Sequence, residues 1–188
     1  YKPYTRICSW NIEFFGLIDI EDQSQPYYQE IAKRIKVIDP AIVCIQEVSS
    51  IVGAKFLTEN LPDYNLYINN KIAKENQDFF SENTLDTIIQ QLRKKNRGKL
   101  INDLLMNCFL VKKNIYVKEF QTIHRRCVKL TYVDPFVNNG EDVTIYNFHL
   151  PSDYSNNNSD KRKEILSEVM SQIEDPISQN VLLCGDFN

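Results

Sequence analysis

Five polar residues follow short apolar runs in this sequence, and their types are those that bind cations and move protons. They are Asn11, Glu47, His149, Asp186 and Asn188. Carboxylate and amide oxygens are ligands that Mg²⁺ prefers, and a histidine can donate to an oxyanion near neutral pH. Asp186 and Asn188 are two residues apart, so in an extended chain their side chains point the same way. Together these residues suit metal-assisted attack on a phosphate ester.

Each of these residues also has an ordinary structural interpretation. A glutamate after an apolar strand is more often a surface residue than a ligand, and a histidine at a strand end is more often simply hydrogen-bonded. An Asp-x-Asn segment after a glycine often forms a turn capped by its own side chains. The joint occurrence of all five residues, in this order, favours a catalytic site over these separate explanations.

Apolar periodicity places the five residues in an α/β domain. The spacing predicts strands over 5–12, 41–46, 63–69, 104–111, 115–122, 127–133, 143–149 and 181–184, and helices over 27–38, 54–61, 84–96 and 160–174. The order strand, helix, strand at the start of the chain is typical of α/β folds. Ligands in such folds bind at the C-terminal ends of the strands, which is where we expect the polar residues.

Composition excludes several classes of protein. The chain has 188 residues, 43% hydrophobic and 25% charged, which predicts one folded domain rather than a disordered chain. No apolar run approaches the roughly 20 residues that a membrane-spanning helix needs. With 22 basic and 25 acidic residues the net charge is −3, so the chain does not coat nucleic acid by charge alone. That balance is compatible with an enzyme that meets phosphate through a bound cation.

The five cysteines form no C-x-x-C pair, so neither a zinc site nor a redox motif is predicted. Four of them lie in apolar runs, where a buried reduced thiol is expected. Such thiols favour a reducing compartment, while secretion stays open, because we expect a chain that starts at Tyr1 to begin inside a longer product. The basic run 93–95 is interpreted as a solvated helix end, with a nucleic-acid contact as the alternative, and we expect a monomer.

Four segments resemble motifs of the endonuclease/exonuclease/phosphatase superfamily, whose fold is deoxyribonuclease I-like. They are SWNI (9–12), PAIVCIQEV (40–48), YNFHLPSD (146–153) and VLLCGDFN (181–188), and they extend from the first strand to the last residue. The resemblance implies an α/β fold, a two-layer sandwich of mixed β-sheets flanked by helices. It also implies a hydrolase that depends on Mg²⁺, with Mn²⁺ or Ca²⁺ as alternative ions.

The same resemblance implies a role for each polar residue. Asn11 and Glu47 belong to the metal site, with Glu47 the direct ligand. His149 contacts the phosphate, Asp186 aligns or activates the attacking water, and Asn188 is its partner in the transition state.

The resemblance also implies an arginine that touches substrate phosphate, assigned to Arg126 with its neighbour Arg125 as the alternative. Either arginine is explained equally well as a charged residue that prevents another chain from pairing with an edge strand.

Two stretches depart from the family pattern. The family continues past GDFN to a Ser-Asp-His motif that completes the site, whereas this chain ends at Asn188. We therefore expect a single domain over 1–188, truncated after GDFN, with activity lower by at least ~100-fold. The polar stretch 70–103 stands where the family has a short loop and a Gly-rich strand.

Three functions remain open at this point. The leading hypothesis is a Mg²⁺-dependent phosphodiesterase that hydrolyses nucleic acid, DNA in particular, because HLP around His149 resembles deoxyribonuclease-like members. The second is a phosphatase or phospholipase of the same fold, acting on inositol phosphates or sphingomyelin, since one scaffold hosts several substrates. The third is a non-catalytic binding fragment.

Overall fold

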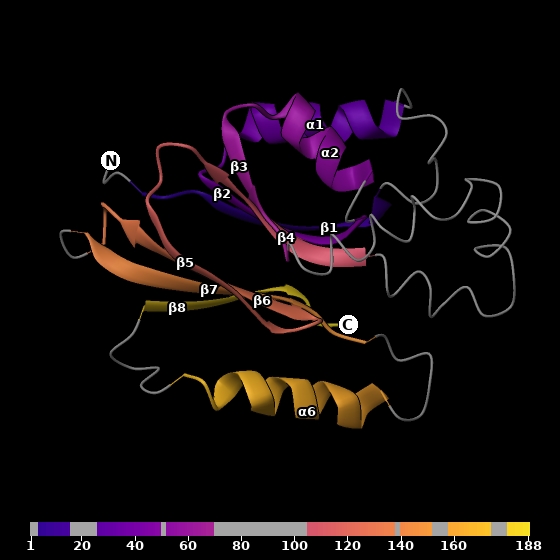
Figure 1. The fold of residues 1–188 in the computed structure, drawn as a ribbon, viewed down its shortest axis with the longest axis vertical. Helices are drawn as coiled ribbons and strands as arrows, with labels where there is room; N and C mark the ends of the chain where they lie inside the picture. The colour runs from indigo at the N-terminus through magenta and orange to yellow at the C-terminus, as the bar shows by residue number, and fades with distance from the viewer. Residues whose placement is uncertain are drawn as a thin grey trace, which may run out of the picture.

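Two mixed β-sheets pack face to face in this chain, with helices on both outer faces (Figure 1). The structure is a computed structural model, and it describes residues 4–15, 26–49, 52–69, 105–137, 140–151, 158–173 and 180–188. This architecture is the expected α/β sandwich.

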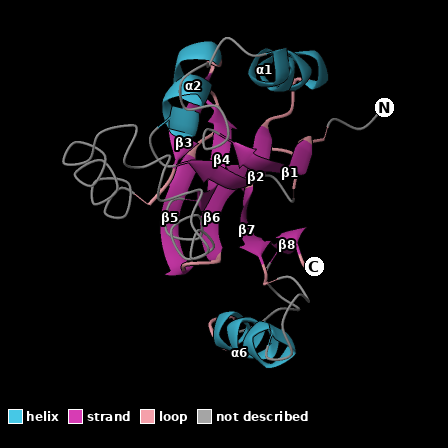
Figure 2. Ribbon diagram, turned by 90° about the vertical axis from the view of Figure 1, so that its right-hand side faces the viewer, coloured by secondary structure: helices cyan, strands magenta, loops and turns pink. Residues whose placement is uncertain are grey.

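The first sheet has the strand order β1-β2-β4-β3 and carries two helices on its outer face (Figure 2). Its elements are β1 (Ile7–Phe15), α1 (Pro26–Ile38), β2 (Ile42–Ser49), α2 (Val52–Asn60), β3 (Tyr64–Tyr67) and β4 (Leu105–Lys112). Strand β2 runs parallel to β1 and antiparallel to β4. Apolar residues of α1 recur at helical spacing and bury Tyr28, Ile31 and Ile35 against the sheet.

The second sheet has the order β5-β6-β7-β8 and one helix on its outer face (Figure 2). Its elements are β5 (Val117–His124), β6 (Cys127–Asp134), β7 (Glu141–His149), α6 (Asn158–Met170) and β8 (Asn180–Asp186). Strands β7 and β8 are parallel, and α6 connects them, as a crossover between parallel strands requires. Ile165 and Val169 of α6 pack against Tyr146 and Phe148 of β7.

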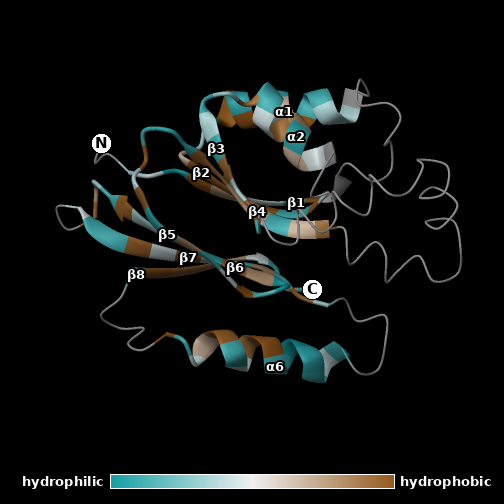
Figure 3. Cartoon of the chain, in the orientation of Figure 1, coloured by the Kyte–Doolittle hydropathy of each residue, from teal (hydrophilic) through white to brown (hydrophobic). Residues whose placement is uncertain are grey.

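Strand β2 lies between the two apolar cores and is buried along its whole length. Ile42 and Cys44 face the second sheet, whereas Val43 and Ile45 face the helices, as alternation in a strand dictates. A strand covered on both faces must be apolar throughout, which explains the run that the sequence shows here. Figure 3 colours much of β2 as hydrophobic.

The expected elements agree with the observed ones wherever the structure describes them. All eight strands and three of the helices are present, with ends that differ by a few residues. The expected helix 84–96 and the polar stretch 70–103 that contains it lie outside the described residues. Among the helices that are described, none is long and apolar enough to cross a membrane.

The turn between β4 and β5 leads from one sheet to the other, which periodicity did not reveal. The backbone N–H of Ile115 donates to the Lys112 carbonyl at 2.9 Å, which closes a turn after β4. The strands that this turn joins, β4 and β5, belong to different sheets. The chain therefore crosses from the first sheet to the second at this turn.

Candidate active site

Glu47 occupies a break in the ladder between β2 and β4. Regular pairing with β4 stops at Ile45 and resumes at Val48, and Glu47 itself has a positive φ of 61°. Such a bulge turns a side chain away from the direction that strict alternation would give it. The residue is 9% exposed, so its carboxylate is held inside the fold at one end of the sandwich.

Asn11 joins Glu47 to the last strand of the second sheet. Its Nδ2 donates to Oε1 of Glu47 at 3.0 Å and to Oδ2 of Asp186 at 2.8 Å. Nε2 of His149 lies 3.2 Å from the same Glu47 oxygen. Four of the residues expected from the sequence therefore form one connected cluster.

The register of β7 and β8 places His149 beside Asp186. The two residues are paired in the parallel ladder, and the N–H of Leu150 donates to the Asp186 carbonyl at 2.8 Å. Gly185, one residue earlier, has φ of 129° and lies against the Phe148 backbone. A residue without Cβ is needed for this close approach. The approach in turn fixes the position of the Asp186 backbone beside β7.

Asn188 contacts the cluster through Asp186. Its backbone N–H donates to Oδ1 of Asp186 at 2.9 Å, and its Nδ2 donates to the Leu150 carbonyl at 2.7 Å. With φ of 47° the residue lies in a turn, not in the extended chain that the two-residue spacing suggested. The capped turn, which was the structural alternative, is what the local geometry shows.

Arg126 supports the strand end that carries His149. Its Nη1 donates to the His149 carbonyl at 3.2 Å, and its own carbonyl accepts from the His149 N–H at 2.9 Å. Burial lowers the pKa of Arg126, Arg125 lowers it further, and Glu47 raises it. A guanidinium in this position keeps its charge and adds positive potential behind the carboxylates. Its contact with substrate phosphate stays a prediction.

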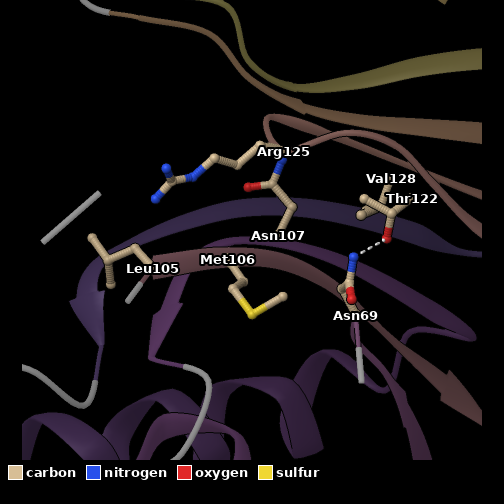
Figure 4. A pocket seen from close by; sticks show the side chains of 7 residues that line it. All are labelled: Asn69, Leu105, Met106, Asn107, Thr122, Arg125 and Val128. Atoms are coloured by element: carbon tan, nitrogen blue, oxygen red, sulfur yellow. Dashed lines mark hydrogen bonds between the residues drawn. The ribbon is translucent and has the colours of Figure 1, made fainter. Parts of the chain in front are cut away.

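Arg125, the alternative arginine, is exposed and lines a small pocket next to the site (Figure 4). Nδ2 of Asn69 donates to Oγ1 of Thr122 at 2.9 Å across one side of this pocket. The Arg125 side chain extends along the opposite side, above Leu105. The two adjacent arginines therefore have different surroundings, because one is tied to the His149 strand and the other is turned to the surface.

The donor set fits a magnesium ion held by few protein ligands. Glu47 and Asp186 each direct a carboxylate oxygen at one amide nitrogen, that of Asn11. Within the described residues no three His, Cys, Asp or Glu side chains form a metal cage. Mg²⁺ commonly uses only one or two carboxylates and completes its shell with water and substrate phosphate. Glu47 and Asp186, with the Asn11 amide beside them, meet that requirement.

Two further buried amides lie directly behind the cluster, and the sequence interpretation gave them no role. Gln46 and Asn147 are 1% and 0% exposed. Both residues belong to motif segments, and a polar residue inside an otherwise apolar strand was the available signal. Local pattern does not reveal which partner such a residue takes, because that partner comes from the other sheet.

Comparison with solved structures identifies similar folds. Truncated TDP2 from Caenorhabditis elegans matches with a TM-score of 0.62 and 19% identity, over 98% of this chain and 62% of that one. TDP2 from D. rerio, complexed with single-strand DNA product, matches with a TM-score of 0.62 and 16% identity, over 98% of this chain and 60% of that one. A mannosyl-6-phosphatase from Bacteroides thetaiotaomicron matches with a TM-score of 0.64 and 14% identity, over 98% of this chain and 66% of that one.

The chain thus spans about three fifths to two thirds of these proteins. No family model matches the sequence, and no curated protein does. All three likenesses lie below 25% identity and therefore show the fold alone. With two mixed sheets, flanking helices and these neighbours, the chain has the deoxyribonuclease I-like fold of the endonuclease/exonuclease/phosphatase superfamily, which its motifs resemble.

Proposed function

We propose that the chain is a Mg²⁺-dependent phosphodiesterase that hydrolyses nucleic acid, with DNA as the preferred substrate. The observation that carries this proposal is the single cluster formed by Asn11, Glu47, His149 and Asp186. These residues come from four strands, and hydrogen bonds of 2.8 and 3.0 Å from Asn11 and a 3.2 Å approach of His149 to Glu47 hold them together. Structural glutamates, asparagines and histidines do not need to meet at one point, whereas phosphoester hydrolysis requires it.

Glu47 and Asn11 supply the cation site in this proposal. Glu47 is the direct ligand, and Asn11 orients it through the 3.0 Å hydrogen bond. When bound, the magnesium ion neutralises the non-bridging phosphate oxygens. The small net charge of the chain, −3, agrees with a protein that meets a polyanion through a cation rather than through a basic surface.

The remaining residues act on the water and the phosphate. Asp186 accepts a hydrogen bond from the attacking water and takes its proton as the new P–O bond forms. The P–O bond to the leaving oxygen breaks in the same displacement, and that oxygen takes a proton from solvent. His149 donates to a phosphate oxygen from Nε2, the nitrogen that faces the site. Asn188 stands beside Asp186 as its partner in the transition state, and Arg126 adds positive charge near the phosphate.

The neighbours support both a nucleic-acid substrate and a smaller one. The D. rerio TDP2 structure contains a single-strand DNA product, which favours the nucleic-acid proposal. The similar mannosyl-6-phosphatase favours a compact phosphomonoester, so a phosphatase or phospholipase acting on inositol phosphates or sphingomyelin is the alternative. Both reactions use the same cluster and differ in what surrounds it.

The test is cleavage of a single-stranded DNA oligonucleotide by the purified chain with and without Mg²⁺, beside an inositol phosphate and a sugar phosphate. We expect Mg²⁺-dependent DNA cleavage that Glu47→Ala abolishes, with binding that weakens steeply as salt rises. Lys55→Ala, an exposed change on α2, is the control and should cleave normally. Turnover of the small esters alone would favour the alternative, and no Mg²⁺-dependent turnover of any ester would reject both.

A further inference from the structure

A buried hydrogen bond between two side-chain amides connects the sheets directly behind the site. Nε2 of Gln46 on β2 donates to Oδ1 of Asn147 on β7 at 2.6 Å. The two residues are 1% and 0% exposed. Gln46 immediately precedes Glu47, and Asn147 precedes His149 by two residues. We call this hydrogen-bonded pair the amide bridge.

The amide bridge is anchored at the point where the first sheet is interrupted. Nδ2 of Asn147 donates to the carbonyls of Ile45 at 3.1 Å and Cys108 at 3.0 Å. Ile45 and Cys108 form the last regular pair of the β2–β4 ladder before the bulge. A side chain of the second sheet therefore binds both strands of the first sheet where their own pairing stops.

A third buried amide extends the connection toward Arg126. Nδ2 of Asn107, which is 3% exposed, donates to the carbonyls of Asn147 and Arg126, both at 3.2 Å. The Arg126 carbonyl also accepts from the His149 N–H. The strands that carry Glu47 and His149 are thus linked through polar groups with defined directions as well as through apolar packing.

We propose that the amide bridge of Gln46 and Asn147 is a positioning device that sets the separation of Glu47 and His149. This inference rests on the proposed function, since it assigns both amides a role in the same reaction without contact to the substrate. Apolar side chains between the sheets would tolerate small sliding, because the hydrophobic effect has no direction. Buried hydrogen bonds have length and angle requirements, and breaking one leaves polar groups unsatisfied.

The distances involved make such control important. Glu47 Oε1 lies 3.2 Å from His149 Nε2, although the two groups come from different sheets. A displacement of about 1 Å at reacting groups can cost on the order of 100-fold in rate. The bulge at Glu47 makes this position sensitive, because β4 does not pair with residues 46 and 47.

The decisive variant is Asn147→Leu, which keeps the approximate size of the side chain and removes every hydrogen bond that it makes. We expect kcat for DNA cleavage to fall about 10- to 100-fold, as for residues that orient metal ligands, with KM changed less than about twofold. Gln46→Leu removes the amide bridge by changing its partner on the first sheet, and it should lower kcat by a similar factor. The double variant should be little worse than Asn147→Leu alone, because Asn147→Leu already removes the hydrogen bond between the two amides.

Tyr132→Phe is the matched control. It also removes a buried hydrogen bond in the second sheet, from Tyr132 to Asp134 at 3.0 Å, but it lies four residues along the β6–β7 ladder from the pair that Asn147 forms with Val128. We expect it to lower the melting temperature while leaving kcat unchanged well below that temperature. Equal losses of kcat in Tyr132→Phe and Asn147→Leu would overturn the proposal, as would normal kcat in Asn147→Leu.

A second readout does not depend on hydrolysis. The chain has two histidines, His124 and His149, so the ring signals of each can be assigned by NMR. Asn147→Leu and Gln46→Leu should shift the His149 ring signals at constant pH, whereas Tyr132→Phe should not. Shifted His149 signals in a chain that hydrolyses nothing would retain the positioning role and reject the proposed function. Unshifted signals would reject the positioning role whatever the activity.

Discussion

Nδ2 of Asn11 lies 2.8 Å from Oδ2 of Asp186, which joins the first strand of one sheet to the last strand of the other across 175 positions of sequence. The same nitrogen donates to Glu47. Two carboxylates that share one site repel each other, and an amide that donates one hydrogen to each offsets that repulsion. The site is therefore organised by a neutral side chain between two acidic ones.

Replacement of Asp186 by asparagine tests the role of its charge in the reaction. The new amide has nearly the same size, but it cannot accept a proton from water. We expect Asp186→Asn to lower the rate of phosphoester cleavage by at least ~100-fold, while Mg²⁺ still raises the melting temperature through Glu47. Rates and melting curves with and without Mg²⁺ check both parts.

Asp134→Asn provides the control for that experiment. Asp134 is also buried in the second sheet, where it accepts from Tyr132 Oη at 3.0 Å and from the Phe136 N–H at 2.9 Å. Its loss should lower stability and leave the rate unchanged. A comparable fall in rate for Asp134→Asn would mean that general destabilisation, rather than the Asp186 charge, explains the effect.

Glu47 combines a proposed ligand with an unfavourable backbone conformation, so its removal should separate function from stability. A residue with a Cβ at φ of 61° costs about 1–2 kcal/mol relative to its ordinary conformation. Glu47→Ala and Glu47→Gly should both abolish the Mg²⁺-dependent rise in melting temperature. The glycine variant should be the more stable of the two by about 1 kcal/mol, measured by urea unfolding without metal. Equal stability of the two variants would contradict the strain at this position.

Much of the fold follows from local sequence pattern. The apolar run of β2 predicts a strand covered on both faces, and the spacing of Tyr28, Ile31 and Ile35 predicts α1. Such patterns are set by which face of an element meets the core, so a short window of sequence is enough to detect them. Motif resemblance then indicates which strand ends carry the polar cluster.

What the pattern could not provide is long-range pairing. Strands over 104–111 and 115–122 were predicted, but not that these strands, β4 and β5, belong to different sheets. Asn188 was expected in extended chain, and its own hydrogen bond to Asp186 puts it in a turn. Gln46 and Asn147 are ordinary polar residues until the two sheets meet. Each of these features depends on contacts between residues far apart in sequence, which periodicity does not encode.

Buried cysteine thiols predict a loss of stability in alkali. Burial raises the pKa of Cys127 from 9.0 to about 12, with smaller contributions from Cys184 and Glu168. The unfolded chain releases this proton first, so stability is fully present below about pH 9 and is lost as pH rises toward 12. We expect the urea concentration at the unfolding midpoint to decrease as the pH is raised from 9 to 11. In Cys127→Ala the decrease should be smaller, when the midpoint of each protein is compared with its value at pH 8. A constant midpoint over that range in the unmodified chain would argue against a buried thiol.

Gly185 should tolerate no side chain at all, because a Cβ there would lie 2.6 Å from the Phe148 nitrogen and closer still to the Phe148 oxygen. These are backbone atoms of the paired strand, so relief requires β8 to move away from β7. That movement would displace Asp186 from His149, its partner in the ladder. We expect Gly185→Ala to lower the melting temperature severely and to abolish cleavage.

Gly140→Ala is the matched control, since Gly140 also has a positive φ, 99°, but its added Cβ would meet only Val133 Cγ1 at 3.7 Å. It should cost about 1–2 kcal/mol from backbone strain alone and retain activity, so equal losses in the two variants would show that φ, rather than the close approach to Phe148, determines the need for glycine.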